Sequence, residues 1–225
     1  MNYRIIHFLL LFALTISSLQ QNKVFAWGWQ THRYINENAV DYLSPEMEFF
    51  EEFKEYLREH STDPDTDDLP GYYHYIDIDY YTEFFEGTFP HDWEDAVDQY
   101  GYDIITANGT VPWVIELWTD SLTILMDDGE WETVWQLAAE LGHYVADSHE
   151  PLHLTLNYNG QLTGNYGIHS RYETQMINAH LSELPLPDST SNYWSSVIDS
   201  VFRYIEEIYP YVNEIIAADD LAAAQ

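Results

Sequence analysis

The residues that decide the fold of this chain read LGHYVADSHEPLH and occupy positions 141–153. His143 and Asp147 are four residues apart, so on a helix their side chains project from one face, a turn apart. His153 comes two residues after Pro151, where that helix should end. Imidazole and carboxylate groups are the ligands that zinc and similar divalent metals prefer. The segment therefore indicates a helix that offers metal ligands to a cavity.

A second segment, GIHSRYE at residues 167–173, repeats this pattern, because His169 and Glu173 are also four residues apart. Five groups of ligand type thus fall within 31 residues. A single histidine is more often structural than metal-binding, but two such pairs with His153 between them favour metal binding. Five groups exceed the four ligands of one tetrahedral zinc ion, so the spacing predicts a cluster of metal ions.

The rest of the chain is mostly helical in pattern, so we predict an all-α fold in a single domain. Residues 72–81 are aromatic and β-branched, which suits either a short strand or an irregular loop. We expect residues 219–225 to fray. Apolar residues recur at helical spacing in residues 36–42, 46–58, 113–126, 131–147, 168–180 and 194–217, the last range being broken at Pro210.

The first 26 residues have the pattern of a secretory signal peptide, with a positive start, an apolar run and a small-x-small cleavage site after Ala26. The apolar run is short for a membrane anchor. We therefore predict a mature domain of residues 27–225 without a transmembrane segment, secreted to the periplasm or the extracellular medium. It contains no cysteine, so bound metal ions would supply the cross-links that disulfides cannot.

The chain is strongly acidic, with 39 Asp and Glu against 7 Lys and Arg and a formal net charge of −32. Such a surface repels polyanions at long range and lacks the basic patch of a tight nucleic-acid binder. Bound divalent cations would return positive charge at one place. The surface as a whole also fits a solubility adaptation to a saline habitat.

Taken together, the motifs resemble those of the zinc-dependent phospholipase C and S1/P1 nuclease superfamily. The similarity runs from Trp27 to about Glu173 and implies a mostly helical domain with three bound zinc ions. The segments that carry it are the central motif at 141–153, the second motif at 167–173, the mature N-terminus WGWQTH at 27–32, the ligand segment HYID at 74–77 and a turn at 108–113.

The resemblance also implies a ligand set for each zinc ion. The first ion would be held by His74, His143 and Asp147. The second would be held by His153, His169 and Glu173, and the third by Trp27 and His32. Asp147 would bridge the first and third ions. Glu173 is a glutamate, as in the phospholipases, whereas the fungal nucleases have an aspartate at that position.

Trp27 would act as a ligand through its free α-amine and its carbonyl oxygen. A peptide nitrogen has no lone pair available to a metal, because it is conjugated to its carbonyl. A free α-amine, with a pKa of about 8, can lose its proton and coordinate. Removal of the signal peptide would therefore create the ligand and couple export to activation. The alternative is that Trp27 is simply an aromatic core residue.

The resemblance places one more aspartate before His74, as a zinc ligand in the nucleases and as the general base in the phospholipases. The loop DPDTDD at residues 63–68 offers Asp65, which fits a Pro-Asp pattern seen in related sequences, and then Asp63. The family often has arginine three residues later, where this chain has Asp68. The loop also looks like a calcium site, but Asp68 stands where that site needs glycine.

These residues imply hydrolysis of a phosphate ester by a metal-activated water, with Asp65 or Asp63 orienting or deprotonating that water. The substrate would be a phospholipid or a single-stranded nucleic acid, and the low number of basic residues favours the phospholipid. A non-catalytic zinc-binding protein is the third alternative. Arg171 would pair with an acidic neighbour or contact a phosphate. No feature indicates an obligate protein partner.

Overall fold

The computed structural model describes residues 27–186 and 191–224. Throughout these two ranges the chain forms α-helices, 3₁₀ turns and one π-helical turn, without a β-strand, which confirms the predicted all-α class. None of the helices in the described part combines the length and apolar character needed to cross a bilayer. The predicted signal peptide, residues 1–26, lies outside the described residues.

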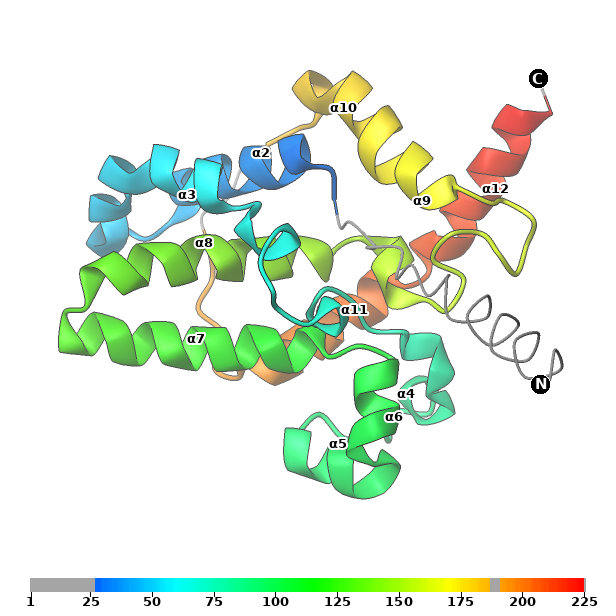
Figure 1. Ribbon diagram of the computed structural model, residues 1–225, viewed down its shortest axis with the longest axis horizontal. Helices are drawn as coiled ribbons and strands as arrows, with labels where there is room; N and C mark the ends of the chain where they lie inside the picture. Colours follow the sequence, from blue (N-terminus) through cyan, green and yellow to red (C-terminus); the bar gives the residue numbers. More distant parts are fainter. Residues whose placement is uncertain (1–26, 187–190, 225) are drawn as a thin grey trace, which may run out of the picture.

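Two long antiparallel helices, α7 (Val111–Asp128) and α8 (Trp131–Asp147), form the centre of the fold (Figure 1). Gly129 ends α7 in the left-handed conformation, with φ 75°, and this lets the chain reverse within two residues. Helices α2 (Trp29–Ala39) and α3 (Lys54–His60) lie along the side of α8 that faces away from α7. Helix α8 is therefore the layer between them.

Shorter elements surround this centre and complete the described chain. The other α-helices are α4 (Thr82–Phe85), α5 (Trp93–Tyr100), α6 (Tyr102–Ala107), α9 (Ile168–Ser170), α10 (Ile177–His180), α11 (Val197–Ile208) and α12 (Tyr211–Ala223). The 3₁₀ turns are η1 (Val40–Tyr42), η2 (Pro45–Phe53), η3 (Asp63–Asp65), η4 (Gly71–Tyr73), η5 (Ile78–Tyr80), η6 (Pro151–Leu154) and η8 (Leu181–Glu183). The π-helical turn η7 (Arg171–Met176) joins α9 to α10.

Helix α8 packs on two apolar clusters, one on each side. On the side of α2 and α3, the rings of Phe53 and Trp135 stack with their centroids 3.6 Å apart. On the side of α7 and α11, Tyr144 is fully buried in the larger cluster. The strip of α8 between these contacts carries His143 and Asp147 near the C-terminal end of the helix. The helix with two ligand-type residues on one face, predicted from residues 141–153, is therefore present.

Residues 72–81 form two 3₁₀ turns, so the irregular loop is the correct one of the two predicted alternatives. The backbone of this segment bonds to two separate parts of the chain and not to one partner strand. The Ile76 N–H donates to the carbonyl of His153 at 2.9 Å, and the Thr110 N–H donates to the carbonyl of Tyr72 at 2.7 Å. The loop therefore holds His74 next to the turn that contains His153.

The prediction that residues 219–225 fray was wrong for most of that range, because α12 continues to Ala223. Arg171 explains the difference. Its guanidinium donates two hydrogen bonds to the Asp219 carboxylate, at 2.9 and 2.7 Å. Asn165 donates a third at 3.0 Å. Of the two roles considered for Arg171, the structure shows the pairing with an acidic residue.

Gly142 allows α2 to approach α8 closely. A Cβ atom at this position would lie 2.0 Å from Oδ1 of Asn36, which is itself buried and donates its side-chain amide to the carbonyl of His32. The approach stacks the ring of His32 on that of His143, with the centroids 3.9 Å apart. A packing contact between two helices thus positions a predicted ligand.

We predict that Gly142→Ala lowers the free energy of unfolding by about 1–3 kcal/mol, the usual cost of overpacking, because Asn36 would have to move. Chemical denaturation of the metal-free proteins measures this. Gly71→Ala is the matched control, since no atom lies within 4 Å of a Cβ placed there. Equal denaturation midpoints for the two variants would contradict the close contact between the helices.

Candidate metal centre

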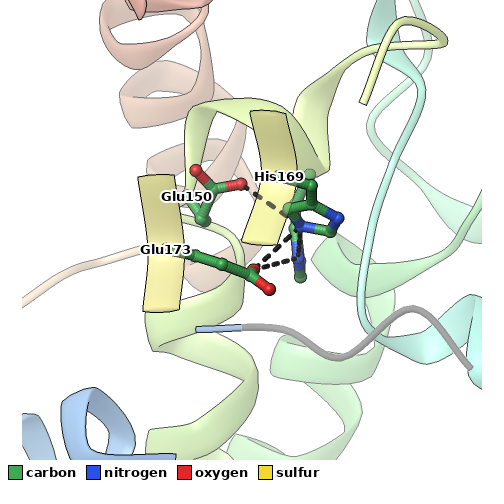
Figure 2. A group of neighbouring side chains, drawn as sticks. Glu150, His169 and Glu173 are labelled. Carbon is green, nitrogen blue, oxygen red and sulfur yellow. Dashed lines mark hydrogen bonds and ion pairs between the residues drawn. The ribbon is translucent and has the colours of Figure 1, made fainter. Parts of the chain in front are cut away.

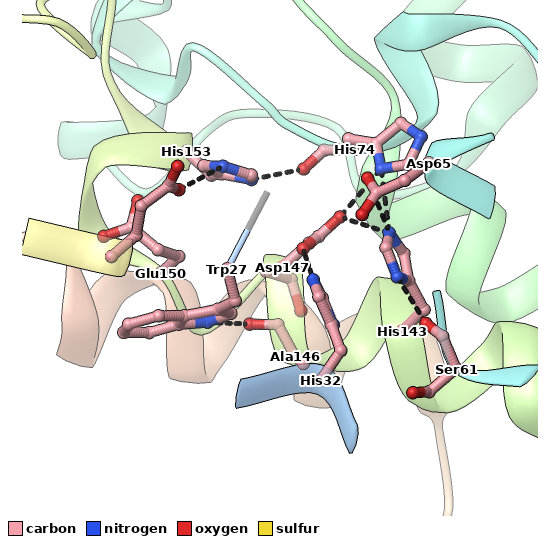
Figure 3. Close-up of polar contacts among 12 residues, drawn as sticks. Trp27, His32, Ser61, Asp65, His74, His143, Ala146, Asp147, Glu150 and His153 are labelled. Carbon is pink, nitrogen blue, oxygen red and sulfur yellow. Dashed lines mark hydrogen bonds and ion pairs between the residues drawn. The ribbon is translucent and has the colours of Figure 1, made fainter. Parts of the chain in front are cut away.

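Asp147, at the end of α8, lies among three histidines from different parts of the chain (Figure 3). Its Oδ1 is 3.3 Å from Nε2 of His32, which α2 contributes. Its Oδ2 is 2.9 Å from Nδ1 of His74, directly after η4, and 3.1 Å from Nε2 of His143, one turn earlier on α8. The two carboxylate oxygens therefore face different imidazoles. We call these residues, together with Asp65, the first cluster.

Asp65 of η3 is the aspartate of the 63–68 loop that reaches this cluster. Its Oδ1 lies 3.8 Å from Nε2 of His143. Asp65, His74 and His143 each offer one ligand atom, and these atoms lie within 4.8 Å of one another. The carboxylate of Asp63 instead contacts Nδ1 of His60 at 2.7 Å. The structure thus brings Asp65, and not Asp63, to the cluster.

The second cluster holds His153 of η6, His169 of α9, Glu173 of η7 and Glu150, which precedes η6 (Figure 2). The Nε2 atoms of His153 and His169 are 3.0 Å apart. Oε2 of Glu173 lies 2.9 Å from Nε2 of His169. One ligand atom from each of the four residues lies within 4.8 Å of the other three, as the ligands of a single ion must.

Backbone carbonyls orient one histidine of each cluster. Nδ1 of His143 lies 2.8 Å from the carbonyl oxygen of Ser61, and Nδ1 of His153 lies 2.8 Å from that of His74. A carbonyl oxygen only accepts, so each Nδ1 carries the proton, and the neutral imidazole presents the lone pair of Nε2 to its cluster. This is the tautomer that a metal requires. The second of these contacts also joins the two clusters.

Several polar atoms of both clusters are buried without a hydrogen-bond partner. They are both ring nitrogens of His32, Oδ2 of Asp65, Oδ1 of Asp147, both carboxylate oxygens of Glu150 and Oε2 of Glu173. Each such atom costs roughly 1–3 kcal/mol, and more when it is charged. Imidazole nitrogen and carboxylate oxygen are the donors that zinc binds in proteins, so zinc ions would satisfy these atoms. The residues present therefore fit this metal.

Comparison with known proteins agrees with that chemistry. The sequence profile of a family described as zinc-dependent phospholipase C matches residues 31–219. This chain belongs to the zinc-dependent phospholipase C family. The match includes every predicted site residue except Trp27. No curated protein and no solved structure matches the chain.

Burial sets the protonation of the candidate ligands in this chain. It lowers the pKa of His32 to about 4 and that of His169 to about 3. Both imidazoles are therefore neutral at pH 7 and free to coordinate. Burial, and then the charge of Glu150, raises the pKa of Glu173 to about 11. Glu173 therefore holds a proton near neutral pH unless a cation replaces it.

Asp147 has the opposite shift. Burial by itself raises its pKa, but the charge and hydrogen bond of His143, followed by the close contact with His32, outweigh burial and hold the pKa well below its usual range. Asp147 is therefore ionised throughout the neutral range. A permanent negative charge at the centre of the first cluster favours a bound cation over an empty cavity.

Trp27 lies beside Asp147 (Figure 3) and is packed as a core residue, which was the alternative to its role as a ligand. Its indole Nε1 donates to the carbonyl of Ala146 at 2.7 Å, and its ring lies 5.7 Å from that of Tyr172. These contacts use the side chain only. Coordination by the α-amine of Trp27 stays a prediction.

Glu150 is the member of the clusters that the sequence analysis missed. It is fully buried, with an exposed fraction of 0%. It lies beyond the end of α8, so no helical periodicity relates it to Asp147. The available signal was a carboxylate directly before Pro151, between two residues already identified as ligands.

We predict that the metal-free protein loses stability as the pH rises from about 7 to about 9, above the range in which His32 and His169 have an opposite effect. The unfolded chain releases the Glu173 proton near the ordinary pKa of 4.5, whereas the folded chain holds it up to a pKa of about 11. In this pH range the folded state binds one proton more at Glu173 than the unfolded state does. The free energy of unfolding therefore falls by about 1.4 kcal/mol per pH unit for this group. Urea denaturation at a series of pH values measures the slope.

Glu173→Gln tests this assignment, because glutamine has no proton to release and its slope should be shallower. Glu206→Gln, at an exposed position on α11, is the control and should keep the wild-type slope. The same slope in all three proteins would show that folding does not hold Glu173 protonated.

Proposed function

We propose that this protein is a secreted hydrolase that uses three zinc ions to cleave phosphodiesters, and that its substrate is a phospholipid cut between glycerol and phosphate. One observation carries the proposal. Asp147 is fully buried, and its two oxygens face separate imidazoles, with His32 on one side and both His74 and His143 on the other. This arrangement suits a carboxylate that bridges two metal ions.

The ligand sets of the three ions follow from the two clusters. We assign Asp65, His74, His143 and Asp147 to the first ion. We assign His153, His169 and Glu173 to the second ion. The third ion would be held by His32, Asp147 and the α-amine and carbonyl oxygen of Trp27. Ligands about 2.0–2.1 Å from a tetrahedral zinc ion are roughly 3.3 Å apart. The separations of 2.9–3.8 Å in the first cluster bracket this value.

When bound, zinc supplies a water whose pKa is lowered toward 7 and stabilises negative charge on the phosphate oxygens. Asp65 would hold that water and accept its proton as the water oxygen bonds to phosphorus and the bond to the glycerol oxygen breaks. Oδ2 of Asp65 has no other partner. Burial raises the pKa of Asp65, which makes its carboxylate a better base. The departing diacylglycerol oxygen then takes up a proton from solvent, and Asp65 releases the proton it accepted, which restores its carboxylate.

A small cavity beside the second cluster favours a phospholipid with a cationic head group. It has a volume of about 130 Å³ and is lined by Tyr75, Asp77, Leu152, His153 and Tyr158. Aromatic faces with a carboxylate are suited to bind ammonium groups. Burial raises the pKa of Asp77 to about 7, so a cation beside it would favour the ionised form. A nucleic acid has no such cation to offer.

The test of this function is turnover by the zinc-loaded protein beginning at Trp27. We expect hydrolysis of a phosphatidylcholine analogue and of the generic diester bis-p-nitrophenyl phosphate, and no cleavage of single-stranded DNA. Cleavage of DNA but not of lipid would favour an S1/P1-type nuclease. Zinc binding without turnover of any substrate would favour a non-catalytic zinc-binding protein.

We predict that His143→Ala loses one zinc equivalent and brings diester hydrolysis to the background rate, because the first ion loses a ligand. Metal analysis of the dialysed protein and the generic diester assay measure the two effects. His180→Ala is the matched control, because this histidine is exposed and contacts only Glu183 through its ring. Unchanged zinc stoichiometry in His143→Ala would contradict the ligand assignment.

We predict that Asp77→Asn raises KM for the phosphatidylcholine analogue by about tenfold, since a desolvated ammonium would lose its anionic partner. The generic diester carries no cationic group, so its KM should not change. Steady-state kinetics on both substrates measure the difference. An equal effect on both would show that Asp77 does not contact the head group.

A further inference from the structure

Glu150 gives the second cluster one carboxylate more than its three predicted ligands require. Its exposed fraction is 0%, and neither of its carboxylate oxygens has a hydrogen-bond partner. It stands at the start of η6, yet no side-chain hydrogen bond caps that turn. A buried carboxylate without a partner strongly destabilises a fold unless a proton or a cation neutralises it.

The side chains of the described residues do not provide that cation. Arg171, the basic residue on the same turn as Glu173, is held by Asp219 and by the carbonyl of Tyr166. The contact of Glu150 with a basic group in the described part of the chain is to the imidazole of His169. That imidazole already faces Glu173 at 2.9 Å. The position of Glu150 therefore points to a partner that is not a side chain.

One carboxylate oxygen of Glu150 lies within 4.8 Å of a ligand atom of each of the other three residues. Figure 2 shows Glu150 and Glu173 both in contact with the ring of His169. Its Oε2 lies 3.9 Å from Nε2 of His169. Oε2 of Glu173 lies 3.9 Å from Nε2 of His153 and 2.9 Å from that of His169, and the two nitrogens are 3.0 Å apart. Ligand atoms around tetrahedral zinc are roughly 3.3 Å apart. The separations among His153, His169 and Glu173 lie on both sides of this value, whereas the oxygen of Glu150 lies somewhat farther out, 3.9 Å from His169.

We propose that Glu150 is a fourth protein ligand of the second zinc ion and closes its coordination sphere with two histidines and two glutamates. The inference rests on the proposed zinc-dependent function. Two carboxylates balance the two charges of the ion, so the buried site becomes neutral. An ion with four protein ligands has no open position for water. The attacking water and the substrate phosphate are then confined to the ions held around Asp147.

Glu150→Gln tests the proposal, because it removes the charge and keeps the size of the side chain. We expect one of the zinc equivalents to bind about 10–100-fold more weakly in competition with a chromophoric chelator, and the others to be unchanged. Cobalt(II) loading gives a second readout, since four-coordinate cobalt absorbs visible light more strongly than five- or six-coordinate cobalt. The variant should lose absorption as water enters the opened site.

Thermal unfolding separates a ligand from a purely structural residue. Without metal, Glu150→Gln should melt at or above the wild-type Tm, because an unpaired buried carboxylate is gone. With zinc, the variant should gain less in Tm than the wild type does. A metal-free variant that melts lower than the wild type, or one with unchanged zinc affinity, would overturn the proposal.

The outcomes also separate this inference from the proposed function. A wild-type protein that binds no zinc defeats both. A wild-type protein that binds zinc and hydrolyses the diester, with a Glu150→Gln variant of equal zinc affinity, defeats only the inference. Glu206→Gln removes the same charge at an exposed position and should leave zinc affinity and Tm unchanged.

Discussion

The structure depends on the burial of carboxylates and imidazoles where water cannot reach them. Asp147 and Glu150 are 0% exposed, and Glu173 is 3% exposed. Burying a carboxylate, either as a charge without a full counter-charge or as a group forced to hold a proton, costs several kcal/mol, which is a large part of the stability of a domain this size. In the metal-free chain the apolar clusters on both sides of α8 must offset that cost. Bound divalent cations would make the burial of these carboxylates favourable, so the stability of this fold and its metal content are linked.

Helix α8 takes part both in the apolar packing and in the buried polar clusters. Its two packed sides hold the apolar clusters, and its third side carries His143 and Asp147. The partners of this third side come from α2, η3 and η4, and the second cluster adds residues from η6, α9 and η7. Metal ions shared among these segments would cross-link parts of the chain that are far apart in sequence. A protein without cysteine can gain from metal ions the kind of constraint that disulfides provide elsewhere.

A strongly acidic surface is compatible with an anionic substrate, because the field of the surface charges and the field of bound cations act over different distances. Exposed charges are screened beyond about 8–10 Å at physiological ionic strength. At the site itself, charges within a few ångströms dominate, and bound cations reverse the local sign. A short diester can therefore bind locally, whereas a long polyanion would also cross the acidic surface. The distribution of charge thus favours a small phosphodiester.

The sequence alone determined the all-α class and the candidate ligand pairs His143–Asp147 and His169–Glu173, because a helix relates residues four apart by a fixed geometry. It did not decide between Asp63 and Asp65, nor between strand and loop at residues 72–81, because each depends on which distant segment supplies the hydrogen bonds. Only the tertiary structure revealed Glu150, which has no periodic relation to a helix and becomes a ligand candidate through burial. Residue spacing determines local geometry, whereas the burial of side chains and their convergence on one site arise when segments far apart in the chain pack together.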